Sequence, residues 1–183
     1  SQGVRNRVAS ELLRLFFREL FEFKLVQTDP NFANFQYQHS QQKIVLLDFG
    51  ATRDIPAPLS DNYKQLMSAA KVNNRELMEE AAQKIGFFQE AISEQQKTVI
   101  LDIFYQACEP LRSEQAYHFG DSTLATRIKA AGMSMSTKAD KWHTPPADAI
   151  FVHRKLAGIY LLASKLDAQV DVKSIFEAAI RTP

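Results

Sequence analysis

The spacing of apolar residues is helical along most of the chain and changes to a strand pattern only once. Apolar residues recur every three or four positions in several long segments, beginning with residues 4–26, which is typical of helices with one buried face. Residues 34–38 instead alternate apolar and polar, and residues 43–49 form a β-branched apolar run after a turn-like Ser-Gln-Gln. The chain is therefore predicted to be mainly α, a helical bundle with one small β-hairpin, whose second strand is buried on both faces.

Further helices are predicted after the hairpin, each bounded by residues that commonly start or stop a helix. Gly86 is expected to end one helix, Ser93 to cap the next, and either Ser60 or Asp61 to cap the first of the series. Residues 111–120 are expected to be irregular. The predicted helical segments are residues 62–72, 74–86, 93–109, 121–132, 147–169 and 171–181.

Length and composition fit one domain and exclude several classes of protein. A chain of 183 residues can bury a substantial core, and a net charge of +1 without a basic run gives no field that would attract nucleic acid. The single cysteine, Cys108, excludes an internal disulfide framework, and no apolar run is long enough to span a bilayer. The first residues resemble no signal peptide and lack an initiator methionine, so we expect a fragment of a longer protein.

Three oxygen-bearing side chains lie near the ends of the two predicted strands. In an antiparallel hairpin, the start of the first strand lies beside the end of the second. A turn near residues 40–42 therefore brings Asn34 next to Asp48, although fourteen positions separate them. Asp29, on the loop that enters the hairpin, is expected to arch over the same point.

These residue types together suit phosphoryl transfer. One carboxylate and one amide oxygen, from Asp48 and Asn34, are suitable ligands for Mg²⁺, which completes its coordination with water and phosphate oxygens. Asp29 is then free to orient an attacking hydroxyl or water, or to accept its proton, and Gly50 allows the chain to turn after the metal ligand. Each of these features alone is common in turns and helix ends, but their order and spacing are typical of a kinase-like site.

At these residues the chain resembles the protein-kinase-like superfamily, in which a catalytic loop ending in Asn precedes a hairpin and Asp-Phe-Gly. It differs from ordinary protein kinases because Gln27 and Thr28 replace the usual His-Arg, and because no Ala-Pro-Glu follows Gly50. Residues 16–53 and 144–166 instead resemble the UbiB/AarF family of atypical kinase-like ATPases, which support ubiquinone biosynthesis. The similarity covers nearly the whole chain.

The resemblance implies that residues 1–183 are a single domain, the carboxy-terminal lobe of a kinase-like fold. The family's amino-terminal lobe, with its alanine-rich nucleotide loop, strand lysine and Lys-x-Gly-Gln extension, has no counterpart in this sequence. Carried over by position, the catalytic aspartate is Asp29, and the metal- and cofactor-binding residues are Asn34 and Asp48. Arg53 matches the arginine that follows Asp-Phe-Gly, and a structural salt bridge within the loop is expected for it.

The resemblance also implies a function for the full-length parent. We expect an ATP- and Mg²⁺-dependent atypical kinase or ATPase that supports ubiquinone biosynthesis, with this fragment inactive alone. Nucleotide is the expected ligand, lipid quinone precursors and ubiquinone-biosynthesis proteins are further partners, and nucleic acid is not one. The expected location is the cytoplasm, at the periphery of the inner membrane, or the matrix side of the mitochondrial inner membrane, with any membrane attachment in regions outside this chain.

The alternative is a non-catalytic helical scaffold that binds a lipid precursor or partner proteins, which the loss of the His-Arg-Asp pattern favours. Under that hypothesis a stripe of apolar residues on the first helix would face a lipid-like ligand, whereas burial in the core is the ordinary fate of such residues. His153 is expected to be a helix-packing residue rather than a ligand or base. The stripe consists of Phe16, Phe17, Leu20 and Phe23.

Overall fold

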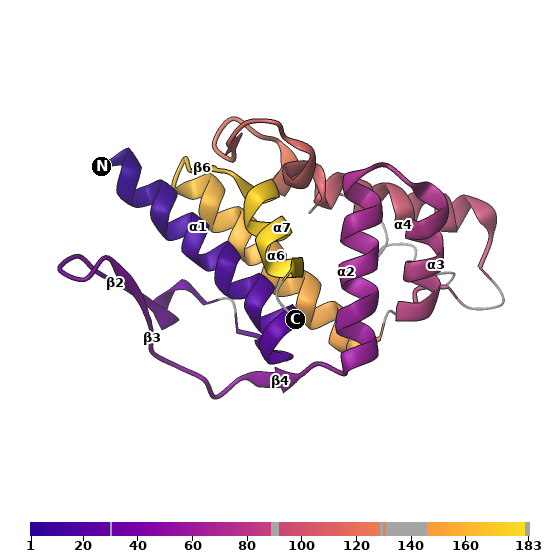
Figure 1. Cartoon of the computed structure of the whole chain (residues 1–183), viewed down its shortest axis with the longest axis horizontal. Coiled ribbons are helices and arrows are strands. Elements are labelled where there is room, and N and C mark those ends of the chain that lie inside the picture. Colours follow the sequence, from indigo (N-terminus) through magenta and orange to yellow (C-terminus); the bar gives the residue numbers. More distant parts are fainter. Residues whose placement is uncertain (30, 89–91, 129, 131–145, 182–183) are drawn as a thin grey trace.

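Helices make up most of the chain, as predicted. The computed structural model describes residues 1–29, 31–88, 92–128, 130 and 146–181. Helix α1 lies beside α6 and α7, while α2, α3 and α4 stand together on the other side of the molecule (Figure 1). None of the described helices is both long enough and apolar enough to cross a membrane. The helices are α1 (Gln2–Arg18), α2 (Ala57–Lys71), α3 (Arg75–Ile85), α4 (Glu94–Ala107), α6 (Ala147–Lys165) and α7 (Val172–Arg181), with a π-helical turn η1 (Glu19–Phe23) and 3₁₀ turns η2 (Phe32–Asn34) and η3 (Glu109–Arg112).

The described strands form three separate two-stranded antiparallel sheets, of which only one was predicted. The predicted hairpin is the pair β2–β3, whose register runs from Phe35 opposite Leu46 to Gln38 opposite Lys43, so that the turn falls where it was expected. The other two pairs are β1–β4 and β5–β6. The strands are β1 (Leu25–Gln27), β2 (Phe35–Gln38), β3 (Lys43–Leu46), β4 (Thr52–Asp54), β5 (Tyr117–His118) and β6 (Gln169–Val170).

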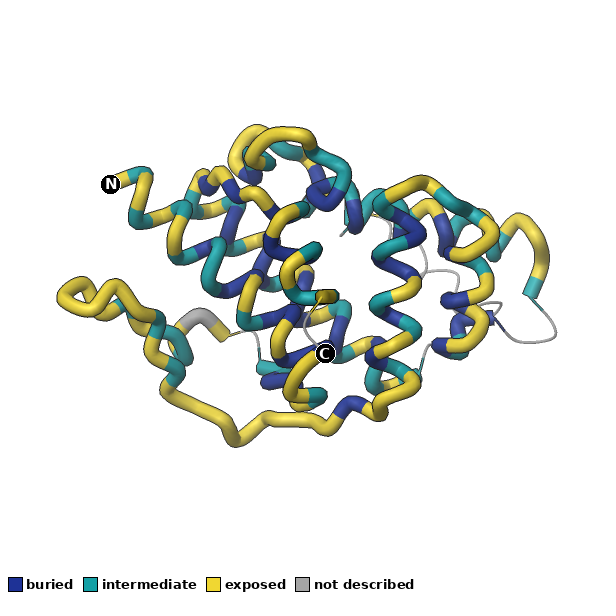
Figure 2. Tube along the Cα trace, in the orientation of Figure 1, coloured by how far each residue is buried: buried dark blue, intermediate teal, exposed yellow. Residues whose placement is uncertain are grey.

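The prediction that the second hairpin strand is buried on both faces is wrong. Along β3, exposed and half-buried residues alternate. Ile44 packs against the core, whereas Val45 is 37% exposed and Leu47, just after the strand, is 51% exposed. The hairpin extends away from the helices, so that no second layer of described residues covers its outer face (Figure 2). A β-branched apolar run indicates a strand but does not establish how many of its faces are covered.

The first helix ends earlier than its apolar pattern predicted. After α1 the chain passes through the π-helical turn η1, and Lys24 adopts a left-handed conformation with φ of 53°. The next residues form β1 and pair with β4, which lies almost thirty positions further along the sequence. Pairing with a distant strand has therefore replaced the last turn that local periodicity predicted.

Local signals predicted the ends of α3 and α4 correctly. Asn74 caps α3 by accepting a hydrogen bond from Leu77, and Gly86 ends it with φ of 99°, a conformation that glycine adopts without strain. Ser93 begins α4 in a reciprocal capping box with Gln96. The 3₁₀ turn η3 then follows α4.

The predicted cap of α2 is wrong. This helix begins at Ala57 after Pro56, with a proline in its first turn, and neither Ser60 nor Asp61 caps it. Ser60 is buried instead, and its hydroxyl donates to the carbonyl oxygen of Leu20 at 2.7 Å. This hydrogen bond joins α2 to the end of the first helix.

The segments predicted to lie between α4 and α6 are only partly described. Residues 117–118 form β5 within the stretch that was expected to be irregular. The helix predicted from residue 121 begins at Leu124, and its end lies outside the described residues. Residues 131–145 also lie outside the described part of the chain.

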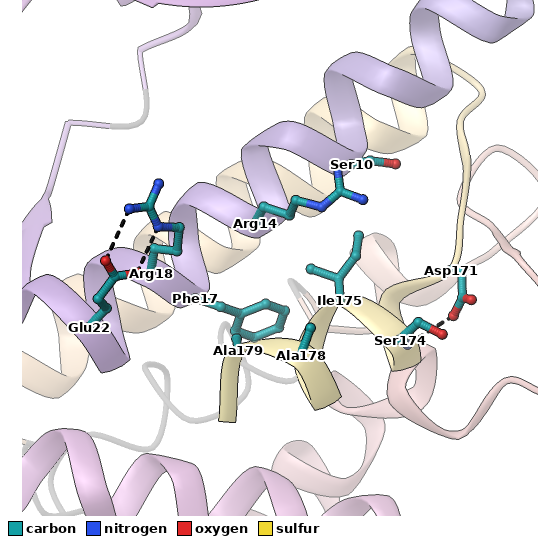
Figure 3. Close-up of a pocket in the computed structure, with 10 residues that line it drawn as sticks. All are labelled: Ser10, Arg14, Phe17, Arg18, Glu22, Asp171, Ser174, Ile175, Ala178 and Ala179. Atoms are coloured by element: carbon teal, nitrogen blue, oxygen red, sulfur yellow. Dashed lines mark hydrogen bonds and ion pairs between the residues drawn. The ribbon is translucent and has the colours of Figure 1, made fainter. Parts of the chain in front are cut away.

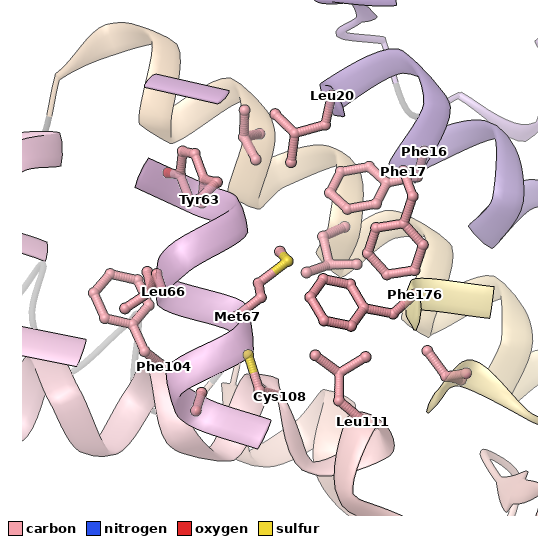
Figure 4. Packing of buried hydrophobic residues seen from close by; sticks show 14 of the residues in the cluster. Phe16, Phe17, Leu20, Tyr63, Leu66, Met67, Phe104, Cys108, Leu111 and Phe176 are labelled. Atoms are coloured by element: carbon pink, nitrogen blue, oxygen red, sulfur yellow. The ribbon is translucent and has the colours of Figure 1, made fainter. Parts of the chain in front are cut away.

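The core lies where α1, α2, α4 and α7 meet, and aromatic rings fill much of it (Figure 4). Phe17 contacts Phe16 at a ring-centroid distance of 5.4 Å and Phe176 at 5.5 Å. Each fully buried side chain of this size contributes about 1.5–3 kcal/mol relative to an exposed one. Of the stripe on the first helix, Phe16, Phe17 and Leu20 are buried, and only Phe23, at 47% exposure, faces solvent. Core packing therefore accounts for three of its four members.

A histidine lies between two carboxylates beside the β5–β6 ribbon. His118 Nδ1 is 2.8 Å from Asp121 Oδ2, and His118 Nε2 is 2.8 Å from Asp167 Oδ1. The hydrogen bond to Asp167, together with the charges of both carboxylates, raises the pKa of His118 above its ordinary value of 6.5. The cluster joins the turn after β5 to the turn after α6.

This cluster should make the stability of the chain depend on pH. Because the pKa of His118 is higher in the folded state, its contribution to stability is fully present below about pH 6.5 and is lost as pH rises through the folded-state pKa. A His118→Asn variant should therefore show a smaller fall in unfolding temperature between about pH 6 and pH 8 than the parent. Calorimetric melting of the two proteins measures this, and identical pH profiles would contradict it.

Candidate functional site

Two short ribbons enclose the predicted catalytic loop. The β1–β4 pair closes one end, where the backbone N–H of Thr28 donates to the carbonyl oxygen of Ala51 at 2.7 Å. The β2–β3 hairpin closes the other end, where the N–H of Leu47 donates to the carbonyl oxygen of Asn34 at 2.9 Å. These bonds join two stretches of chain. The described part of the first is residue 29 with residues 31–34, which we call the entering limb, and the second is residues 48–50, which we call the leaving limb.

On the entering limb, Asp29 and Asn34 are in direct contact. The side-chain amide of Asn34 donates from Nδ2 to Asp29 Oδ2 at 2.9 Å, and both residues are half-buried. The backbone N–H of Asn31 donates to the other oxygen, Asp29 Oδ1, at 3.2 Å. The 3₁₀ turn η2 brings the two side chains together across five positions of sequence. The geometry expected for these two residues is therefore present.

Asp48 lies on the leaving limb and is exposed. The backbone N–H of Gly50 donates to Asp48 Oδ1 at 2.7 Å, and a Cβ at position 50 would lie 3.1 Å from the same oxygen. Within the described part of the chain, the Asp48 carboxylate bonds to neither Asp29 nor Asn34. The structure therefore brings Asp29 and Asn34 into contact. It places Asp48 on the leaving limb, one residue after Leu47, whose N–H bonds to Asn34.

The oxygen atoms of the site suit a hard cation. The side-chain nitrogen of Asn34 donates a hydrogen bond to Asp29. The side-chain oxygen of Asn34 is therefore the atom available to a metal. Asp48 uses Oδ1 to accept from Gly50 and has Oδ2 as its second oxygen. One carboxylate and one amide form an incomplete cage of the kind that Mg²⁺ occupies together with water and phosphate. Among the described residues, no group of three or more His, Cys, Asp or Glu side chains could hold a metal ion alone.

Apolar side chains flank Asp48 on the surface. Leu47 before it is 51% exposed and Phe49 after it is 58% exposed. Exposed residues continue through the leaving limb and β4, which run along the outside of the helices (Figure 2). Large apolar residues gathered on a surface commonly mark a place where another part of a protein packs.

The salt bridge predicted for Arg53 exists, but its partner is not in the loop. Arg53, in β4, pairs with Asp148 in the first turn of α6, 95 positions away in sequence. The guanidinium of Arg53 also lies 5.0 Å from the ring centroid of Phe151. The prediction of a salt bridge within the loop is therefore wrong, because α6 passes close enough to β4 to supply the carboxylate.

A buried ion pair beneath the site was missed in the sequence. Lys155 of α6 binds Glu19 of η1, and their side chains are only 4% and 7% exposed. Burial raises the pKa of Glu19 and lowers that of Lys155, and the attraction between them opposes both shifts. Glu19 lies in η1, which packs against β1, the strand that ends two residues before Asp29. The sequence signal for this pair was a lysine within the apolar pattern of α6, because a buried charge needs a partner of opposite charge.

His153 is a packing residue, as expected. Its ring stacks on Phe87 at a centroid distance of 5.4 Å, and its Nε2 lies 2.9 Å from the hydroxyl of Tyr63. Burial lowers the pKa of His153 to about 4, so the ring is neutral at physiological pH. Its surroundings are apolar and its hydrogen bond joins α6 to α2.

A groove of about 390 Å³ lies between α1 and α7, away from the ribbons (Figure 3). Phe17 and Ile175 form part of its wall, and Arg14 and Arg18 line it from α1. Arg18 is held by Glu22 through two hydrogen bonds of 2.8 and 3.0 Å. The groove combines an apolar wall with charged side chains of both signs.

Comparison with known proteins finds similar sequences among atypical kinases. Residues 1–82 match the ABC1 atypical kinase-like domain. The chain is 35% identical over 181 residues to the mitochondrial atypical kinase COQ8B of Rattus norvegicus, and the match covers 97% of this chain and 33% of that protein. It is 31% identical over 180 residues to the mitochondrial atypical kinase COQ8 of Saccharomyces cerevisiae, covering 97% of this chain and 35% of that protein. The chain thus spans about a third of the length of these curated relatives.

A solved structure shares the fold. Rv3197 from Mycobacterium tuberculosis, determined in complex with erythromycin, superposes with a TM-score of 0.73 over 98% of this chain and 44% of that one, at 21% sequence identity. The fold is therefore kinase-like as well as mainly helical. This likeness concerns the fold alone, and the family follows from the sequence comparisons. The chain belongs to the UbiB/AarF family of atypical kinase-like proteins, which contains the ABC1 domain.

Proposed function

We propose that the full-length protein is an ATP- and Mg²⁺-dependent atypical kinase or ATPase that supports ubiquinone biosynthesis. The observation that carries the proposal is the Asp29–Asn34 hydrogen bond on the entering limb, with Asp48 on the leaving limb opposite. Relatives that are named atypical kinases match nearly the whole chain, and this similarity supports the proposal.

Asn34 and Asp48 are the residues that would hold the metal, through the amide oxygen and the carboxylate. Bound there, Mg²⁺ would neutralise charge on the nucleotide phosphates. Asp29 does not need to touch the ion, because its two oxygens accept from Asn34 and Asn31. It therefore has the role of orienting an attacking hydroxyl or water, or accepting its proton.

In this proposal, residues 1–183 form one domain, the carboxy-terminal lobe, and the nucleotide is held between it and an amino-terminal lobe outside these residues. The side chains of Leu47 and Phe49, beside Asp48, are apolar and exposed, which supports the proposal that the amino-terminal lobe covers this surface. The fragment alone then lacks the groups that cover the phosphates, and it should hydrolyse little or no ATP.

The proposed setting follows from the relatives. Their names describe them as mitochondrial, which supports the matrix side of the mitochondrial inner membrane over the bacterial cytoplasm as the location. Lipid quinone precursors and other ubiquinone-biosynthesis proteins are the proposed partners.

Replacing Asp48 tests the proposal directly. An Asp48→Asn variant of the full-length protein should lose Mg²⁺-dependent nucleotide affinity by at least about 10–100-fold, the loss typical of disturbing a metal site, and with it ATP hydrolysis. Because Asp48 is exposed, the variant should fold normally. Titration of nucleotide with and without Mg²⁺ measures the effect. Undiminished hydrolysis would count decisively against the assignment.

The same variant separates the proposal from a scaffold function. If Asp48→Asn still restores ubiquinone synthesis in deficient cells, the protein acts by binding rather than by catalysis. The groove between α1 and α7, with Phe17 and Ile175 in its wall and arginines beside them, is the place that favours this second function.

A further inference from the structure

Helix α6 makes ion pairs with β4 and with η1, the turn that leads into β1. Asp148 lies in its first turn and Lys155 lies seven residues later, two helical turns away and therefore on the same side of the helix. Asp148 binds Arg53 of β4, and Lys155 binds Glu19 of η1. Both ion pairs join parts of the chain that are far apart in sequence.

The Lys155 contact reaches the entering limb. Glu19, which Lys155 holds, lies in η1, the turn that leads into β1 and packs against it. Gln27 is itself buried, and its side-chain Oε1 has no hydrogen-bond partner among the described residues. Asp29 follows two residues later. The buried pair thus fixes the strand from which the entering limb starts.

The Asp148 contact reaches the leaving limb. Arg53 lies five residues after Asp48 and pairs across the ribbon with Val26 of β1. Its guanidinium is held by the Asp148 carboxylate and by the ring of Phe151, both on α6. One helix is therefore joined to one strand of the ribbon, β4, and to the turn that leads into the other, β1.

We propose that α6 is a positioning helix for the candidate site, with Lys155 and Asp148 as positioning residues that set the distance between the two limbs. This inference rests on the proposed function. Catalytic groups must be held within about 0.5 Å of their productive places, and a displacement of about 1 Å can reduce rate a hundredfold. Apolar residues are often at least as stabilising in a core as a buried ion pair. The Glu19–Lys155 pair is therefore better explained by the need to position the chain near the site than by stability.

The exposed pair gives the cleaner test, because its loss should not unfold the protein. In the full-length protein, Asp148→Arg and Arg53→Asp should each lower kcat for ATP hydrolysis by about tenfold or more, with KM for ATP changed less than about twofold. The charge-swapped double variant should recover most of the lost kcat. Asp102→Asn is the matched control, because it breaks a comparable exposed ion pair, with Arg75, between α3 and α4 and away from the site.

The buried pair is tested by removing both charges together. Glu19→Met with Lys155→Met leaves no uncompensated charge, so the melting temperature should stay near that of the parent, yet η1 loses its polar attachment to α6. We expect kcat to fall by about tenfold or more in this folded variant.

The outcomes separate this inference from the function on which it rests. Full kcat in the Asp148 and double-methionine variants, while Asp48→Asn abolishes Mg²⁺-dependent binding, would overturn the positioning role and leave the proposed function intact. A charge swap that recovers nothing would also overturn it, since the effect would not pass through the ion pair. An unaffected Asp48→Asn variant would overturn the proposed function and the positioning role with it.

Discussion

Replacing Lys155 alone with methionine should lower the free energy of unfolding by about 3–5 kcal/mol, because it leaves the Glu19 carboxylate buried without its counter-charge. Burial already raises the pKa of Glu19, and without Lys155 that pKa should rise further. The variant should therefore be least destabilised in acid, where Glu19 is protonated, and should lose stability as pH rises through the folded-state pKa. Denaturant unfolding at several pH values measures both effects.

Two further variants make this result specific. Lys173→Met removes a lysine whose partner, Glu114, is 84% exposed, and it should leave the denaturation midpoint nearly unchanged. Adding Glu19→Met to Lys155→Met should restore most of the lost stability, because apolar groups often replace a buried ion pair without cost. A single Lys155→Met variant within about 1 kcal/mol of the parent would show that the pair is not buried as described.

Replacing Asp29 with asparagine should lower the rate of ATP turnover by about 10²–10⁴-fold, the usual contribution of a positioned acid–base group. Asparagine can still accept from the amide of Asn34, so the loop should keep its shape, but it cannot accept a proton. Mg²⁺-dependent nucleotide affinity should change little. Single-turnover kinetics and nucleotide titration of the full-length protein separate the two quantities.

The contrast with neighbouring carboxylates sharpens this prediction. Asp54→Asn changes an exposed carboxylate at the end of β4 and should leave turnover unaltered. Asp48→Asn should instead lose nucleotide affinity. Equal turnover in the Asp29→Asn variant and the parent would remove Asp29 from the chemistry, whatever its contact with Asn34.

Several features of the fold could be predicted because they depend on neighbouring residues alone. The ends of α3 and α4 follow from Asn74, Gly86 and Ser93, each of which bonds or bends within its own turn. The β2–β3 hairpin follows from an alternating segment and a short turn. The strands of β1–β4 and β5–β6 could not be predicted, because two or three residues carry no measurable periodicity and pair with distant partners.

In the candidate site, too, contacts between residues close in sequence could be predicted and contacts between distant residues could not. Asp29 was expected to arch over the point where Asn34 lies beside Asp48; it does contact Asn34, whereas Asp48 accepts from Gly50 instead. The partner of Arg53 was predicted wrongly, and the Glu19–Lys155 pair was not predicted, because these partners lie 95 and 136 positions apart. Nothing in the local pattern indicates which distant charge a side chain will meet.

The sequence by itself determined the helical bundle, the hairpin and the three residues proposed for catalysis and metal binding, since hydrogen bonding within a turn and the alternation of apolar residues act over short distances. Only the tertiary structure decided that the hairpin is exposed, that Asp29 bonds to Asn34 while Asp48 lies on a second limb between the same two ribbons, and that α6 is ion-paired to β4 and to η1. Those features depend on which surfaces are left uncovered and which charges meet when distant helices pack, and packing is a property of the whole chain.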